Sequence, residues 1–75
     1  MSHTYTVILE PAEEGGFFVR VPALPEVITE GDTKAEALAM AEDAITLVLE
    51  SRRERGEPIP VERSAPILRQ LTVAA

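Results

Sequence analysis

The sequence predicts an α+β domain with the element order β-β-β-α-β, in which one mixed sheet carries a single long helix on one face. Three observations lead to this prediction: short alternating segments fill the first half, one long segment has helical spacing, and another alternating segment follows it. The chain has 75 residues, so we expect one domain over residues 1–75, with residues 1–3 as an N-terminal tail.

The first half predicts a hairpin followed by a third strand. Residues 4–10 (TYTVILE) and 17–21 (FFVRV) alternate between apolar and polar positions, as half-buried strands do. Pro11 ends the first strand, and Gly15–Gly16 permits the positive φ angles of a tight loop. Residues 27–30 predict a short third strand.

The segment VPALP, residues 21–25, predicts a rigid corner between the second and third strands. Pro22 and Pro25 fix their own φ angles and disfavour helix at the residues before them. Leu24 lies between the prolines and can close the end of the sheet. Gly31 is expected to supply an unusual backbone angle before the helix.

A capping box predicts where the helix begins. Thr33 is followed three residues later by Glu36, so the hydroxyl can accept from the Glu36 amide while the glutamate reaches back to the Thr33 amide. Gly56 predicts the end of the helix, after basic residues in its last turn. The expected apolar stripe consists of Leu38, Ala41, Ile45, Val48 and Leu49. The expected solvent face carries Glu36, Asp43, Glu50 and Glu54.

The last part of the chain predicts a return loop and a fourth strand. Residues 57–66 contain three prolines and no helical period. Residues 67–73 (ILRQLTV) alternate, and a right-handed crossover would place them beside and parallel to the first strand. Ile8, Phe18 and Ile28 would then lie on the sheet face without a helix. Because so short a chain has a marginal core, we expect these residues to form an interface and the chain to be a homo-oligomer.

Composition narrows the possible functions. There are no cysteines, which excludes disulfides and thiolate metal sites. No membrane-spanning run or secretion signal is present, so we expect a cytoplasmic protein. The net charge of −6 favours basic partners and disfavours nucleic acid. A local patch of Arg52, Arg53 and Arg55 would be the exception.

The chemistry-bearing residues favour binding over catalysis. His3, the only histidine, lies in the expected tail, and no serine has a neighbour that would activate it. Glu10, Asp32 and Asp43 could approach one another around a divalent metal, but a solvated role is preferred. We therefore expect no enzyme activity, no metal and no cofactor. Glu13 and Glu14 at the hairpin tip are either a soluble loop or a contact for a basic partner.

The ordered set of motifs resembles the HicB-type antitoxin family. The opening strand TYTVILEP, the hairpin EEGG, the corner VPALP, the helix start GDT and EAL, a DAI stretch and a closing IP follow one another between Thr4 and Pro60. No single motif is specific, but the order is. The residues that carry the resemblance are Tyr5, Gly15, Gly16, Pro22, Leu24, Pro25, Gly31, Asp32, Thr33, Glu36 and Ala37.

The resemblance implies a degenerate ribonuclease H-like fold and an antitoxin that occludes the active site of HicA, a small basic mRNA-cleaving toxin. The sequence differs from the family pattern where Glu26 replaces a usual glycine. It also ends at Ala75, so we expect no C-terminal DNA-binding module. Two alternatives remain open: a regulatory oligomer without a toxin, and a small metal-dependent nuclease.

Overall fold

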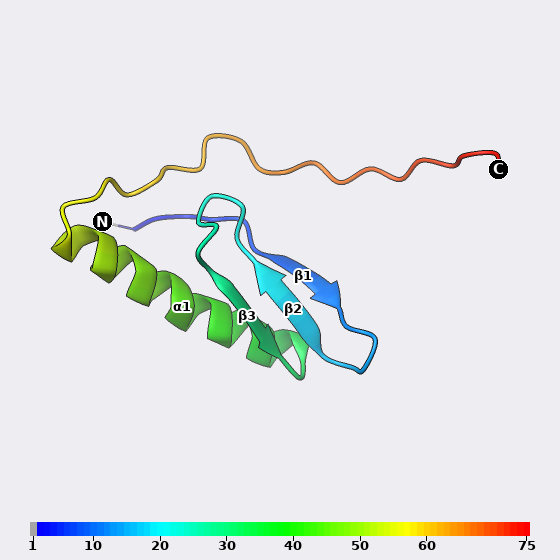
Figure 1. Ribbon diagram of the computed structural model, residues 1–75, viewed down its shortest axis with the longest axis horizontal. Helices are drawn as coiled ribbons and strands as arrows, with labels where there is room; N and C mark the ends of the chain where they lie inside the picture. Colours follow the sequence, from blue (N-terminus) through cyan, green and yellow to red (C-terminus); the bar gives the residue numbers. More distant parts are fainter. Residues whose placement is uncertain (1) are drawn as a thin grey trace.

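Three short strands and one long helix form the folded part of residues 2–75, which are the residues that the computed structural model describes (Figure 1). The strands are β1 (Ile8–Pro11), β2 (Phe17–Arg20) and β3 (Ile28–Gly31), and the helix α1 spans Lys34–Glu54. The sheet order is β1-β2-β3, and both pairs are antiparallel. The α+β class is thus confirmed, while the relation to ribonuclease H stays a prediction.

The hairpin between β1 and β2 forms where the sequence predicts it. Ala12 N donates to Gly16 O at 3.0 Å, and Gly15 N donates to Ala12 O at 3.1 Å. Gly15 and Gly16 have φ angles of 101° and 76°, which residues with a Cβ rarely adopt. The turn pairs Leu9 with Val19 in the register of the sheet. β1 itself is shorter than predicted and begins at Ile8 rather than residue 4.

The corner after β2 consists of two successive turns. Leu24 N donates to Val21 O, and Val27 N donates to Leu24 O, both at 2.9 Å. Pro22 and Pro25 each occupy the second position of their turn, for which their fixed φ is suited. Leu24 is fully buried, and its two turn partners are 1% exposed. The corner is therefore a core element that closes one end of the sheet.

Both ends of α1 have the predicted capping residues. Glu36 N donates to Thr33 Oγ1 at 3.1 Å, but the Glu36 carboxylate accepts from the Asp32 amide, at 3.4 Å, rather than from Thr33. At the other end, Gly56 has a φ of 69°. Bonds from Gly56 N and Glu57 N to the carbonyls of Arg53 and Arg52 complete a Schellman motif.

The buried face of α1 matches the predicted stripe except at Leu38, since Ala41 and Leu49 are buried and Ile45 and Val48 pack partly buried against the core. Ala37, Ala41 and Leu49 are buried against the sheet and the corner. Leu38, expected in the stripe, is half exposed at 50%. The helix packs over β3 and β2. Leu38 is therefore only partly covered by the sheet.

Gly31 is required by close packing and not by an unusual φ angle. Its φ is not positive, which corrects the sequence prediction. A Cβ at this position would lie 2.4 Å from the Ala37 amide nitrogen. The absence of a side chain thus lets the end of β3 approach the first turn of α1.

The predicted fourth strand does not form within residues 2–75. Residues 57–75 contain no helix or strand; residues 60–62 contact the segment leading into β1, and the chain after them extends beyond the sheet (Figure 1). The apolar residues of the expected strand are exposed by 72–89%; they are Ile67, Leu68, Leu71 and Val73. The prediction of a mixed sheet was therefore wrong for this chain, whose sheet is entirely antiparallel.

The candidate partner-binding face

The outer face of the sheet, opposite α1, combines apolar and charged side chains in two rows. The strand register places Arg20 between Ile8 and Ile28 in one row, and Phe18 between Glu10 and Glu30 in the next. Ile28 is 79% exposed and Phe18 is 54% exposed, whereas Ile8 is half-buried. We call these six residues the outer face. The three apolar residues lie on the sheet face predicted from the sequence.

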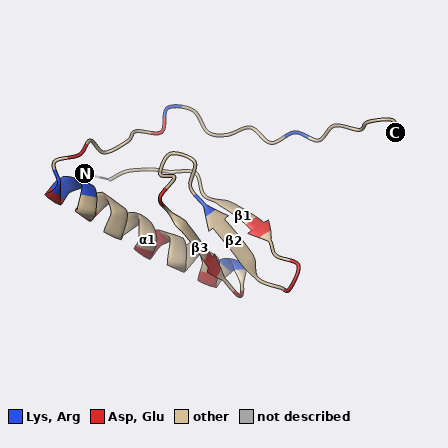
Figure 2. Ribbon diagram, viewed as in Figure 1, with Lys and Arg blue, Asp and Glu red and all other residues tan. Residues whose placement is uncertain are grey.

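Acidic side chains surround the exposed aromatic ring. A shallow hollow is lined by Phe18, Glu30 and the hairpin-tip residues Glu13 and Glu14. Figure 2 shows the acidic residues of β1, the hairpin loop and β3 gathered at this end of the sheet. The hollow therefore offers an apolar anchor within a negative rim, a combination that suits a basic partner.

Charge is only partly neutralised on the outer face. Arg20 Nε lies 2.8 Å from Glu10 Oε1, and both side chains are more than half exposed. Of the described residues, none forms an ion pair with Glu13, Glu14 or Glu30. An exposed pair such as Arg20–Glu10 contributes little to stability. The rim of the hollow keeps its negative charge.

The opposite end of the outer face is apolar. Ile28 lies beside Pro22 and Pro25 of the corner, in a second shallow hollow that also includes Arg20. The outer face thus has an acidic end at the hairpin and an apolar end at the corner. A partner that covers both ends would be fixed in one orientation.

The basic residues at the end of α1 do not form a free cationic patch. Arg52 is paired with Glu26 and Arg55 with Glu57. The hydrogen bond from Arg55 lowers the pKa of Glu57, and the bond from Glu57 raises the pKa of Arg55. Local ion pairs therefore weaken the case for an arginine patch that would bind nucleic acid.

Other chemistry-bearing residues are dispersed. His3 stacks on Tyr5 with ring centroids 6.3 Å apart, and its Nε2 lies 3.4 Å from Arg53 Nη2. No group of three or more histidine or carboxylate side chains in residues 2–75 could hold a metal ion, so Glu10, Asp32 and Asp43 do not converge. α1, the helix of this part of the chain, is too polar to span a bilayer.

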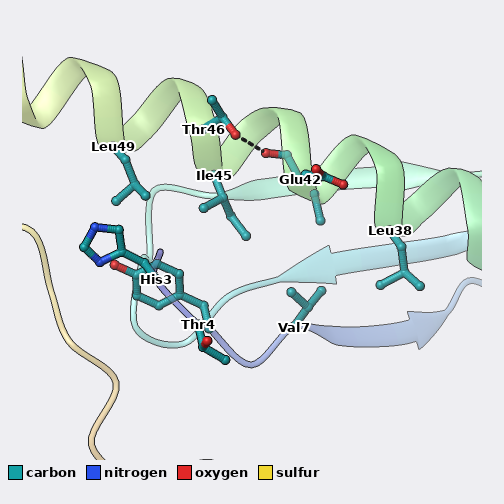
Figure 3. A pocket seen from close by; sticks show the side chains of 10 residues that line it. His3, Thr4, Val7, Leu38, Glu42, Ile45, Thr46 and Leu49 are labelled. Atoms are coloured by element: carbon teal, nitrogen blue, oxygen red, sulfur yellow. Dashed lines mark hydrogen bonds between the residues drawn. The ribbon is translucent and has the colours of Figure 1, made fainter. Parts of the chain in front are cut away.

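A groove that the sequence did not predict lies between α1 and the segment leading into β1 (Figure 3). Val7, Leu38 and Ile45 point into it from both sides, as Figure 3 shows. Its remaining lining residues are His3, Thr4, Tyr5, Ala41, Glu42, Thr46 and Leu49. The groove exists because α1 covers β2 and β3 but leaves the inner side of β1 open, an outcome of packing that periodicity does not reveal.

Comparison with known proteins gives a consistent result. A family model described as HicB-like antitoxin of bacterial toxin–antitoxin system matches residues 5–72. The protein Antitoxin HicB 1 of Photorhabdus laumondii is 53% identical over 57 residues, which cover 76% of this chain. Antitoxin HicB of Escherichia coli K12 is 42% identical over 57 residues, again 76% of this chain.

The similar proteins differ in length. This chain spans only 37% of the Photorhabdus relative and 41% of the Escherichia coli relative. In contrast, UPF0150 protein Ta0767 of Thermoplasma acidophilum is 43% identical over 63 residues, which cover 84% of this chain and 91% of that protein. The matched region is thus a unit that occurs both within longer proteins and nearly alone.

Proposed function

This chain belongs to the family of HicB-like antitoxins of bacterial toxin–antitoxin systems, and we propose that it binds and inhibits a small basic mRNA-cleaving toxin of the HicA type. Inhibition would result from covering the toxin's active site. The observation that carries this proposal is the hollow in which Phe18 is surrounded by Glu13, Glu14 and Glu30.

Charge supports this mechanism. A protein that cleaves RNA needs cationic side chains to hold the phosphate backbone. An acidic surface that binds those side chains competes directly with the RNA. Complementary charge also speeds encounter and suppresses wrong partners, and the net charge of −6 provides it.

The exposed aromatic ring supports the outer face as the contact surface. Buried aromatic anchors commonly dominate the free energy of protein–protein binding. Phe18 lies at the middle of its row between two glutamates, so a partner could bury the ring while its basic residues contact the rim. Ile8 and Ile28 would extend the contact toward the corner.

The toxin-free alternative is a regulatory oligomer, and we propose self-association in either case. The exposed apolar residues of the C-terminal segment support it, because large apolar side chains gathered on one segment usually meet a partner. The two functions differ in whether a basic partner is required.

Co-expression with any small basic protein that is found to be encoded beside this gene tests the proposal. We expect rescue of growth, co-purification, and loss of RNA cleavage by the toxin in the presence of excess antitoxin. Phe18→Ala should weaken binding by roughly 30-fold, the effect of about 2 kcal/mol at an anchor residue. Glu30→Lys should slow association and reduce its dependence on salt.

Leu47→Ala is the matched control, because Leu47 is an exposed apolar residue of α1 at 65% exposure and lies off the outer face. It should bind as the wild type does. A toxin whose RNA cleavage continues unchanged at saturating antitoxin would overturn the proposal. Equal weakening by Phe18→Ala and Leu47→Ala would instead reject the outer face as the contact surface.

A further inference from the structure

The C-terminal segment Ile67–Val73 has the pattern of a strand but no strand partner in its own chain. Its apolar residues are exposed by 72–89%, although the sequence alternates as an edge strand would. β1 has β2 on one side and is an edge of the sheet on the other. An open edge presents unpaired backbone groups that can accept another strand.

The segment that follows α1 is fixed to the rest of the chain at residues 60–62. The Thr6 amide and hydroxyl donate to the two carboxylate oxygens of Glu62, at 2.8 and 2.6 Å. The Tyr5 hydroxyl donates to the Pro60 carbonyl at 2.6 Å. These bonds hold residues 60–62 beside the segment that leads into β1.

This anchor sets a register that excludes pairing within the chain. Parallel extended segments advance by nearly the same distance per residue. With Glu62 beside Thr6, Ile67 would lie opposite Pro11, where β1 ends. Residues 68–73 would extend beyond the strand, and Pro66, which has no amide hydrogen, would face it. The apolar segment therefore cannot pair with β1 of its own chain.

The groove between α1 and the segment leading into β1 provides a matching surface next to the free edge of the strand. Val7, Leu38 and Ile45 line it, and Leu38 is half exposed. A strand added to the free edge of β1 would direct alternate side chains toward the end of this groove at Val7, the residue before β1, and Leu38. Ile67, Arg69, Leu71 and Val73 share one face of the segment by alternation, so this face is apolar except at Arg69.

Charge favours a second copy of this chain as the source of the strand. Residues 63–75 contain two arginines, Arg63 and Arg69, and no acidic residue. Residues 1–62 contain all 13 acidic residues and five of the seven basic ones, which is a net charge of −8. Glu42 lies on the rim of the groove. A basic strand from one copy thus meets an acidic body in the other.

We propose that two copies of this chain exchange their C-terminal segments, so that Ile67–Val73 of each adds as a strand to the free edge of β1 in the other and covers the end of the groove at Val7 and Leu38. Reciprocal exchange closes the assembly, since both contacts are the same. This main-chain pairing is the mode by which exposed sheet edges take up extended peptides.

Size-exclusion chromatography with light scattering on the full chain tests the exchange. We expect a mass of at least twice 8.2 kDa. Leu71→Asp in the segment and Leu38→Asp in the groove should each raise the dissociation constant by at least roughly 30-fold, because each places a charge in an apolar contact. Far-UV circular dichroism should show the α1 signal unchanged, since both side chains are outside the buried core.

Matched controls separate the exchange from general surface effects. Thr72→Asp lies on the other face of the segment, and Leu47→Asp lies on α1 away from the groove; both should keep the wild-type mass. An equimolar mixture of Leu71→Asp and Leu38→Asp chains should form a heterodimer, because one intact segment can still meet one intact groove.

Three results would overturn the exchange: a monomeric wild type, a dimer that persists in both Asp variants, or a mixture that stays monomeric. A dimer broken only by Phe18→Asp would assign self-association to the outer face instead. These measurements use this chain alone, so their outcome is separate from the test of toxin binding.

Discussion

Glu26 and Arg52 form a two-bond ion pair that joins the corner to the last turn of α1. Arg52 Nε and Nη2 donate to the two carboxylate oxygens of Glu26, each at 2.9 Å. The third guanidinium nitrogen, Nη1, donates to the Pro58 carbonyl at 3.2 Å. One arginine thus connects the end of α1 with the distant corner and with the loop that follows the helix. The arginine side chain is only 18% exposed.

This pair explains why glutamate is accepted where the family pattern usually has glycine. Glu26 occupies the third position of the second corner turn, and its φ is not positive. The backbone therefore has no need of glycine here. The side chain adds a contact that glycine could not make.

The stability contributed by Glu26 should depend on pH. The hydrogen bond from Arg52 lowers the pKa of Glu26 below its ordinary value of 4.5. A carboxyl with a lowered pKa in the folded state stabilises fully above its unfolded pKa, and this contribution is lost as the pH falls through the folded value. The Tm of Glu26→Gln should therefore lie below that of the wild type at neutral pH and converge with it in acid.

Thermal melts of the wild type and Glu26→Gln, from neutral pH into acid, measure the difference in Tm. Glu57 and Glu62 also have lowered pKa values, from hydrogen bonds with Arg55 and Thr6, so both proteins should lose stability in acid. Only the difference between them isolates Glu26. A Tm difference that is constant down to strong acid would contradict this role of the ion pair.

Gly31→Ala should be among the most destabilising small substitutions in the chain. The added Cβ would lie 2.4 Å from Ala37 N and 2.6 Å from Ala37 Cα, so β3 and α1 would have to separate. We expect a loss of about 3 kcal/mol in the free energy of unfolding, at the upper end of overpacking effects. Urea denaturation measures it.

Gly56→Ala is the control for this prediction. Its φ of 69° is unfavourable for alanine, but no atom lies within 4 Å of the added Cβ. A loss of about 1 kcal/mol is expected from the left-handed backbone alone. Equal losses for the two variants would contradict close packing as the reason for Gly31.

Leu24→Ala should show that the corner belongs to the core. Leu24 is fully buried, with Val21, Val27 and Leu49 in the same cluster. Removal of a buried leucine side chain costs about 2–5 kcal/mol. Leu47→Ala, at an exposed position, should change stability by less than about 0.5 kcal/mol. A small effect of Leu24→Ala in urea denaturation would show that the corner is dispensable.

Local signals in the sequence were sufficient to predict most of the fold. The glycine pair of the hairpin, the Thr33 cap and the Gly56 stop act through nearby backbone atoms, so their positions follow from short motifs. The two prolines of the corner likewise fix turns around Leu24. The outer face of the sheet follows from strand alternation once the register is known.

The errors concern features that depend on how the elements pack against one another. Residues 67–73 alternate like a strand, but alternation does not specify a partner, and the Thr6–Glu62 anchor sets a register that β1 cannot match. Leu38 has helical spacing, but the helix packs on β2 and β3 and leaves that side chain half exposed. The reason for Gly31 likewise required the position of Ala37.

The most direct test of the central proposal is a calorimetric titration of this chain into a small basic HicA-type protein encoded beside its gene, in a catalytically inactive form that can be purified. We expect saturable binding whose affinity falls as the salt concentration rises. Phe18→Ala should lower this affinity by roughly 30-fold, and Leu47→Ala should leave it unchanged. Absence of binding at low salt between two folded proteins would contradict the proposal that this chain is the antitoxin of that partner.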